Sequence, residues 1–383
     1  MMLSRPIELL ILFIVSRFLF QPRITEDSIH VYKPIPTPVQ YDLYWNKTAS
    51  SLHEFGHYIV NQYDYDDLQY GIPFNEYYGK MENRYVGFGQ PIFPDYVKTG
   101  HLQPYKEGNN VLMITGCSDN HFVSAVPAMY AMLNASATVN IAFIDYGLLP
   151  EQVEELKSVF DYIHRVHVAM NASSIIVYRK FDFRKAPTWM NIFDCNTRGG
   201  YAWKVIGYMD LLFEWKAMGA WIDAGSLIYD GIDVELKYAK MEGMYVPPSP
   251  GNVSRWTHPL MIQFVESMGM TGKVDRNETN CSSGHFFMDF SNITAVNTIF
   301  KPFLQCAYTM KCITPRGTSK ANHRQEQAGI TLFLHNAHLV YSAQREYSHA
   351  ALFRQERGGA AIMREYEKKL KRDINRRYGI QVM

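Results

Sequence analysis

The sequence lacks an excess of charge of either sign. Its 38 Lys and Arg residues are matched by 37 Asp and Glu residues, which leaves a formal net charge of +1 over 383 residues. Proteins that bind nucleic acid usually carry a net basic charge or a cluster of basic residues on one face. The overall charge therefore gives no indication of a nucleic-acid partner, and none is expected.

The sequence also lacks a long hydrophobic run near its N-terminus. The apolar stretch 9–15 follows Arg5 and is shorter than the roughly 20 apolar residues that a membrane-spanning helix requires. A basic residue followed by about 7–15 apolar residues is typical of a signal segment. Because the residues before Gln21 are bulky, cleavage is disfavoured. We interpret residues 1–22 as a signal anchor, with a cleaved signal peptide and a buried first helix as alternatives.

Cysteine is scarce, and its number is odd, so the five cysteines cannot all pair with one another. Cys306 and Cys312 are close enough in sequence to close a small loop, and Cys195 with Cys281 is a second candidate pair. Cys117 would then be left as a small core residue.

N-glycosylation signals are plentiful. Seven Asn-x-Ser/Thr sequons are spread along the chain, and none has Pro in the middle position. They support a lumenal location in the ER or Golgi, or secretion if the N-terminal segment is cleaved. The acceptor residues are Asn46, Asn134, Asn171, Asn252, Asn277, Asn280 and Asn292.

Residues 23–109 form an irregular, aromatic-rich stretch that we interpret as a stem or an N-terminal lobe. Within it, residues 53–57 match H-E-x-x-H, a motif that places two imidazoles and a general base on one helix face for zinc. Such a zinc site needs a third ligand. Metzincin peptidases use a His at the position that Tyr63 occupies here, so the remaining candidate is Glu76, at a distance that thermolysin-like enzymes could use. A chance match is the favoured interpretation, and a zinc metallopeptidase is the alternative function.

A regular alternation of strands and helices begins at residue 110. Apolar runs at 111–115, 138–145 and 220–222 predict buried strands, and helical spacing predicts helices at 123–133, from Pro150 onward and from Tyr201 to a stop at Gly219. Further short strands are expected at 166–169 and 174–177. This rhythm predicts a mostly parallel sheet with crossover helices.

Three loops of this pattern would share one edge of the sheet, namely 115–119, 145–147 and 223–226. Asp223 ends the third strand, and open α/β sheets bind ligands in the crevice outside their strand ends. The alternative is that Asp-Ala-Gly-Ser at 223–226 is only a turn that leaves a strand.

Six separated blocks make this part of the chain resemble a known family. It is similar to a group of glycosyltransferase-like proteins that is abundant in nematodes and similar in outline to nucleotide-sugar transferases of the GT-A fold. The resemblance covers about residues 110–340 and implies that residues 110–345 form a Rossmann-like α/β domain. Such a domain binds a nucleoside diphosphate sugar and transfers the sugar to an acceptor hydroxyl of a glycan, lipid or protein. The blocks are NVLMITGCSDNHF, IAFIDYGLLPEQVEELK, FDFRKAP, YAWKVIGYMDLL, WIDAGS and LQCAYTMKCITPRGTSKANHRQEQAGITLFL.

The resemblance also implies roles for single residues. Asp223 takes the first position of an Asp-x-Asp pair that holds Mn2+ or Mg2+, but Gly225 stands in place of the second acid. Asp230 and Asp233 are candidate additional ligands. Because the second acid is missing, both a metal-dependent and a metal-independent enzyme remain open at this point. The expected donor-binding residues are Thr115, Asp119, Asp145, Lys204, Gly225, Ser226, His323, Arg324 and Gln327, with Arg316 and Lys320 as further phosphate contacts.

The catalytic residues are less well marked. Asp223 is one candidate, and a general base requires a carboxylate within hydrogen-bond reach of the acceptor hydroxyl, for which Glu326 and Asp289 are the first two expected. An inactive, glycan-binding protein of the same fold is a second alternative. Residues 346–383, rich in Lys and Arg, are expected to form a solvated terminal helix.

Overall fold

The central strand of the sheet is β2 (Leu112–Cys117), and all six of its residues are buried. It pairs in parallel with β3 (Asn140–Asp145) on one side and with β5 (Met218–Ile222) on the other. A strand with parallel neighbours on both sides and helices over both faces must be apolar throughout. The apolar residues 112–114 and the complete burial of β2 therefore fit its central position.

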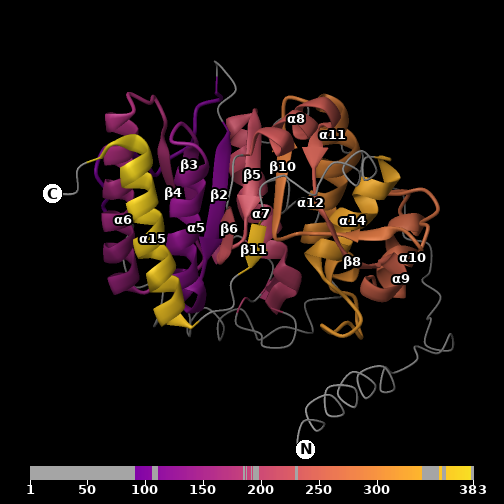
Figure 1. Ribbon diagram of the computed structural model, residues 1–383. Helices are drawn as coiled ribbons and strands as arrows, with labels where there is room; N and C mark the ends of the chain where they lie inside the picture. Colours follow the sequence, from indigo (N-terminus) through magenta and orange to yellow (C-terminus); the bar gives the residue numbers. More distant parts are fainter. Residues whose placement is uncertain are drawn as a thin grey trace, which may run out of the picture. The chain divides into compact units, whose positions relative to one another are not determined.

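The computed structural model describes residues 91–105, 111–183, 186, 188–190, 192, 198–228, 232–338, 353–355 and 359–380 (Figure 1). The predicted signal anchor, almost all of the stem, the 53–57 motif, Asn46 and Cys195 lie outside these residues. Within the part of the chain that is described, no helix has the length and apolar character needed to cross a membrane.

Seven strands form the main sheet in the order β1-β4-β3-β2-β5-β10-β7. The pairs β1–β4, β4–β3, β3–β2 and β2–β5 are parallel, whereas β10 is antiparallel to both β5 and β7. The predicted α/β class with a mostly parallel sheet is confirmed. The bounds of the remaining strands are Val97–Lys98 for β1, Ile176–Lys180 for β4, Met244–Tyr245 for β7 and His285–Asp289 for β10.

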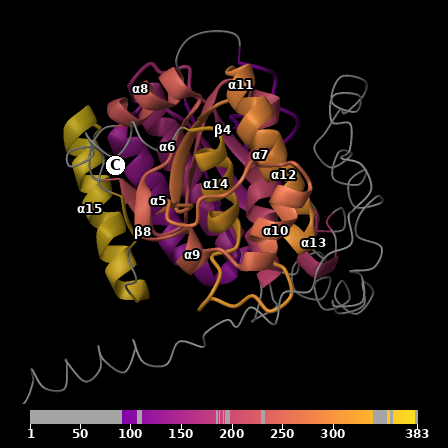
Figure 2. The same cartoon turned by 90° about the vertical axis from the view of Figure 1, so that its right-hand side faces the viewer.

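Helices cover both faces of this sheet. Figure 2 shows α5 and α6 on one side and α7 and α12 on the other. The side of α5 holds a large apolar cluster with Met113 and Phe143 of the sheet. On the opposite side, Gly207 of α7 lies against Tyr146, where an added Cβ would be 2.3 Å from the phenol oxygen. The helix bounds are Phe122–Ala135 for α5, Pro150–Ala169 for α6, Ala202–Trp215 for α7 and Lys301–Tyr308 for α12.

Two local predictions are wrong. Residues 166–169, expected as a strand, are the last turn of α6, because Val166 continues the buried face that Leu156 and Ile163 begin. Gly219, expected to end the helix, lies in β5 instead. Helix α7 ends three residues earlier, where Lys216 adopts a left-handed conformation (φ 57°) that terminates helical hydrogen bonding.

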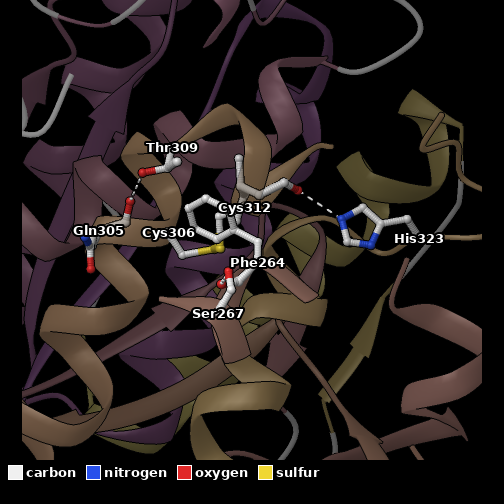
Figure 3. Close-up of a disulfide and its surroundings, with 8 residues drawn as sticks. Phe264, Ser267, Gln305, Cys306, Thr309, Cys312 and His323 are labelled. Carbon is white, nitrogen blue, oxygen red and sulfur yellow. Dashed lines mark hydrogen bonds between the residues drawn. A yellow bond between two sulfur atoms is a disulfide. The ribbon is translucent and has the colours of Figure 1, made fainter. Parts of the chain in front are cut away.

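The segment after β5 adds the outer elements of the fold. A two-stranded sheet pairs β8 (Pro248–Asn252) with β9 (Thr279–Cys281). A disulfide joins Cys306 and Cys312, and Figure 3 shows it near Phe264 of α10. Cys281 is a free, buried thiol, and its candidate partner Cys195 lies outside the described residues. The other elements are α8 (Asp233–Glu242), α9 (Val253–Trp256), α10 (Pro259–Ser267), α11 (Ile293–Ala295), a π-helical turn (Val296–Phe300), α13 (Met310–Ile313) and α14 (Glu326–Asn336).

The ends of the domain extend beyond the predicted limits of 110 and 345. Strand β1 joins the main sheet, and β11 (Phe353–Gln355) pairs with β6 (Ser226–Ile228). The C-terminal helix α15 (Ala360–Tyr378) packs against α5. Its Met363 and Ile374 are fully buried, and Arg364 forms an ion pair with Glu155 of α6. The terminal helix is therefore amphipathic rather than wholly solvated.

Candidate functional site

A cavity of about 710 Å3 opens at the carboxyl ends of β2 and β5. Gly116, Cys117 and Ser118 line it from the end of β2, and Asp223 lines it from the end of β5. Chain order places β3 and β4 to one side of β2 and β5 to the other, so this is the topological switch point at which open α/β sheets bind ligands.

A tight turn fixes the position of Asp223. Its backbone carbonyl accepts a hydrogen bond from the Ser226 N–H at 2.9 Å, and its own N–H donates to the Gly284 carbonyl at 2.7 Å. Gly225 has a φ of +90° in this turn, a left-handed value that strongly favours glycine at the third turn position. The glycine that replaces the second acid of the expected pair is therefore required by the turn itself.

The ammonium group of Lys204 lies between two carboxylates. Its Nζ is 2.7 Å from Oδ1 of Asp223 and 3.0 Å from Oε1 of Glu326. It also donates to the Ser283 carbonyl at 3.0 Å. An ammonium has three donors, and all three are used inside the protein. The Lys204 side chain is only 5% exposed, against 26% for that of Asp223.

The charges of this cluster support one another. Burial by itself would lower the pKa of Lys204, but the negative charges of Asp223 and Glu326 and their hydrogen bonds outweigh it, so this pKa is raised. Burial raises the pKa of Glu326, and the nearby charge of Asp223 adds to this effect, while Lys204 offsets only part of it. At neutral pH the cluster therefore holds a firmly protonated lysine, and Glu326 has an increased affinity for protons.

Other hydrogen bonds hold the two carboxylates in place. The Trp221 indole N–H donates to Oδ1 of Asp223 at 2.6 Å, and the Ser283 hydroxyl donates to Oε1 of Glu326 at 2.9 Å. Both bonds reach the same oxygens that Lys204 contacts. Within the described residues, Oδ2 of Asp223 and Oε2 of Glu326 make no hydrogen bond. Each carboxylate therefore keeps one oxygen for a ligand.

Three cationic residues, Arg198, Lys320 and Arg324, line the cavity, and we call them the rim cations because Lys320 and Arg324 are exposed and Arg198 is half-buried. The Arg324 guanidinium lies 4.0 Å from the centre of the Trp256 ring, a cation–π contact that orients its planar fork. Arg198 precedes α7, and Lys320 lies in the exposed turn before α14. Neither Arg198 nor Lys320 forms a side-chain hydrogen bond or ion pair with any other residue that the structure describes. Their charges are available to an anion.

The beginning of α14 completes the cavity. Gln325, Glu326 and Gln327 all line it, and the first backbone N–H groups of a helix carry partial positive charge that favours anionic ligands. This end of the helix is held by Arg324, whose N–H donates to the Trp256 carbonyl at 3.0 Å. The positive helix end and the rim cations therefore flank the same space.

The structure brings six of the predicted site residues to this cavity. They come from the end of β2, α7, the end of β5 and the start of α14: Asp119, Lys204, Asp223, Arg324, Glu326 and Gln327. Because all three donors of Lys204 are used within the protein, this lysine organises the two acids and offers no free donor for a phosphate. The predicted phosphate contact Arg316 does not line the cavity, whereas Lys320 does.

Five other predicted residues serve the fold rather than the cavity. Thr115 is fully buried in β2. The Asp145 carboxylate accepts backbone N–H groups of Gly147 and Leu148 at 2.7 Å each and the Tyr178 hydroxyl at 2.6 Å, so it stabilises a turn. Gly225 and Ser226 build the turn behind Asp223.

His323 is the fifth of these, and it fastens the segment that follows the disulfide. Its Nδ1 accepts the His258 backbone N–H at 3.2 Å, which leaves Nε2 to donate to the Ile313 carbonyl at 2.9 Å (Figure 3). The ring is fully buried, and burial lowers its pKa to about 4. His323 is therefore a neutral residue that positions the chain next to the site.

Asp289 is excluded from the site by the register of β10. This strand runs antiparallel to β5, so His285 pairs with Ile222 at the cavity end and Asp289 pairs with Met218 at the far end. Its carboxylate accepts the Ser291 N–H and hydroxyl and lines a different cavity. The prediction of Asp289 as the base for this cavity is therefore corrected.

Several lining residues carried no clear signal in the sequence. Asn120 and His121 follow β2 in a 3-10 turn, and Tyr201 and Trp203 lie at the start of α7. These four residues adjoin segments that the sequence already assigned to the site, and this proximity could have indicated that they line the cavity. Ser283 reaches the cavity only because β10 folds back beside β5, and no local pattern marks it.

The residues at Asp223 do not fit a divalent cation. Oδ1 already accepts from an ammonium and an indole, and Gly225 supplies no carboxylate. Of the candidate additional ligands, Asp230 lies outside the described residues and Asp233 lines the other cavity. Within the described part of the chain, no three His, Cys, Asp or Glu side chains are grouped so that they could hold a metal ion.

Comparisons with known proteins give glycosyltransferases of low similarity. No family model and no curated protein matches the chain. Among solved structures, it is similar to the apo form of the bifunctional glycosyltransferase WbbM, with 11% identity and a TM-score of 0.31 over 61% of this chain and 39% of that chain. Apo mouse xyloside xylosyltransferase 1 matches with 10% identity and a TM-score of 0.37 over 60% and 83% of the two chains.

A third match is the galactosyltransferase LgtC in complex with donor and acceptor sugar analogues, with 10% identity and a TM-score of 0.36 over 68% and 96% of the two chains. The chain spans well under half the length of WbbM. At TM-scores of 0.31 to 0.37, these similarities carry no argument about the activity of this chain.

Proposed function

We propose that the cavity binds a nucleoside diphosphate sugar and that the protein transfers the sugar to an acceptor hydroxyl. The observation that carries this proposal is the position of a polar cavity at the switch point of the sheet, with two carboxylates in its wall and cations at its opening. This arrangement suits a ligand with an anionic diphosphate and a hydroxyl-rich sugar. The family resemblance over about residues 110–340 supports the same assignment.

In this proposal the two ends of the cavity have different tasks. The diphosphate lies against the rim cations and the start of α14, where charge-assisted hydrogen bonds are strong. The sugar lies toward Asp223, whose Oδ2 accepts from its hydroxyl groups. During transfer, the bond between the anomeric carbon and the phosphate oxygen breaks, and the anomeric carbon bonds to the acceptor oxygen. The negative charge then passes to the diphosphate, which the rim cations stabilise.

We assign Glu326 as the group that takes the proton of the acceptor hydroxyl. Burial raises its pKa, which makes the carboxylate a stronger base than an exposed glutamate. Its Oε1 is held by Lys204 and Ser283, so Oε2 is left to face a ligand.

We further propose that the protein works in the lumen of the ER or Golgi, on a membrane anchor or as a secreted form. The disulfide between Cys306 and Cys312 supports an oxidising compartment. The sequon residues Asn171 and Asn277 are exposed, and Asn134, Asn252 and Asn292 are partly exposed. Asn280 is fully buried in β9 and contacts Thr331, so it is removed from the expected acceptors.

A nucleotide-sugar binding panel on the full-length protein tests the proposed function. Thermal stability is measured with UDP, GDP, CDP and ADP and their sugar conjugates, with and without Mn2+. At least one nucleotide should raise the melting temperature. Asp223→Asn should reduce the rise in melting temperature that the corresponding nucleotide sugar produces. Asp289→Asn is the matched control, because this second strand-end aspartate lies outside the cavity and should leave the shift unchanged. No shift with any of these ligands would contradict the proposal.

Turnover separates the enzyme from the alternative of an inactive glycan-binding protein. The bound donor should be hydrolysed slowly even without an acceptor, and free nucleoside diphosphate measures this reaction. Glu326→Gln should retain donor binding but lower transfer by roughly 100-fold or more, as the loss of a general base does. Donor binding with neither hydrolysis nor transfer would favour the binding-only alternative.

A further inference from the structure

We propose that this cleft recognises the diphosphate with side-chain cations and without a divalent cation, and that the ammonium of Lys204 takes the place of a metal between Asp223 and Glu326. The inference rests on the proposed function and specifies how its ligand is held. Three independent features of the site support it.

The first feature is the position of the ammonium. Nζ of Lys204 lies 2.7 Å from Oδ1 of Asp223 and 3.0 Å from Oε1 of Glu326. Mg2+ binds carboxylate oxygens at about 2.0–2.1 Å, so an ion at Oδ1 would share this oxygen with a positive charge only a few ångströms away. The lysine is itself almost completely buried and uses all three of its donors. An ion placed between Oδ1 of Asp223 and Oε1 of Glu326 would have to displace an ammonium that both carboxylates hold in place.

The second feature is the turn at Gly225. The Asp-x-Asp pair that the resemblance leads one to expect would need an acid at this position. The φ of +90° makes the position costly for any residue with a Cβ. The backbone that presents Asp223 to the cavity is therefore built for glycine and cannot readily accept the missing ligand.

The third feature is a set of cations that could replace the metal's charge. Arg198, Lys320 and Arg324 all line the cavity. Arginine binds phosphate oxygens through two parallel N–H groups, and Arg324 is already oriented by Trp256. Within the described residues, Arg198 and Lys320 have no anionic partner. A diphosphate would supply the negative charge that these residues lack.

Isothermal titration of the full-length protein with UDP and with GDP tests this inference. Each titration is run in EDTA and again in MnCl2, and electron paramagnetic resonance of Mn2+ reports whether the ion joins the complex. The dissociation constant of the bound nucleotide should differ by less than about threefold between the two buffers. Arg198→Gln should weaken binding in EDTA about tenfold, and Lys320→Gln should weaken it by roughly threefold.

Exposed residues outside the cavity provide matched controls. Arg276→Gln and Lys273→Gln remove the same charges from the 271–278 turn, which does not line the cavity, and should leave affinity unchanged. Binding that requires Mn2+, or a protein-bound Mn2+ signal in the complex, would overturn the inference but support the proposed function. If Arg198→Gln and Lys320→Gln both leave the affinity in EDTA unchanged, these cations do not bind the diphosphate, and that assignment would be overturned. No binding in either buffer would contradict the proposed function itself.

Discussion

Removal of the Lys204 ammonium should destabilise the protein more than almost any other single substitution of a charged residue. In Lys204→Met the aliphatic chain is kept, but Asp223 and Glu326 lose their shared cation. The two contacts, at 2.7 and 3.0 Å, are each worth about 6 kcal/mol of attraction at an effective dielectric constant near 20. The cost of burying the lysine offsets much of this. Experience with buried pairs gives a net loss of about 3–5 kcal/mol when one partner is removed.

Urea unfolding at pH 7, followed by far-ultraviolet circular dichroism, measures this loss as a decrease in the free energy of unfolding. Lys273→Met is the matched control, because Lys273 is exposed in the 271–278 turn and its substitution should change stability by less than about 0.5 kcal/mol. In a second step, Asp223→Asn and Glu326→Gln are added to Lys204→Met. These changes remove the uncompensated charges, so they should restore a substantial part of the lost stability.

The expected recovery distinguishes an electrostatic cluster from simple packing. If Lys204→Met lowers the free energy of unfolding by less than about 1 kcal/mol, the ammonium does not hold the two acids together. If the loss is large but the added amides make it larger, the lysine acts through its packed aliphatic chain. Either result would refute the charge reasoning on which the metal-free site depends.

Three further predictions follow from other parts of the fold. Gly225→Asp should lower the free energy of unfolding, measured in urea, by about 1–3 kcal/mol, because the position has a positive φ. Gly100→Asp is the control: a Cβ there meets no other atom within 4 Å, so stability should not fall. Replacement of Cys306 and Cys312 by Ala should lower the free energy of unfolding by about 2 kcal/mol, because the disulfide no longer restricts the unfolded chain. The variant is compared with the wild type under non-reducing conditions, and equal stabilities would mean that the bond does not form. Burial lowers the pKa of His323 to about 4 from 6.5, so only the unfolded state binds this proton between those values. His323 therefore contributes stability that is complete above pH 6.5 and is lost as the pH falls toward 4, by about 3 kcal/mol; His323→Gln should flatten this part of the curve, and an unchanged acid transition would contradict the assignment.

Sequence patterns were sufficient to predict the frame of the site. Largely apolar runs at β2 and β3 predicted buried parallel strands, because strands covered on both faces favour such composition. Strands that run in parallel end at the same edge of a sheet, so the chain order and the strand ends together predicted that Asp119 and Asp223 lie near one another. The resemblance then assigned Lys204, Glu326 and Gln327 to the same edge from distant parts of the chain.

The roles of these residues depend on tertiary contacts. Whether Lys204 faces a ligand or two carboxylates is set by the packing of α7 against β5 and by the approach of α14, which are contacts across 122 residues of sequence. The antiparallel register of β10 removed Asp289 from the site and brought Ser283 into it. Local patterns specify where strands and helices begin, because they reflect each segment's own burial. They do not specify charge pairing, because an ion pair depends on which distant segments meet.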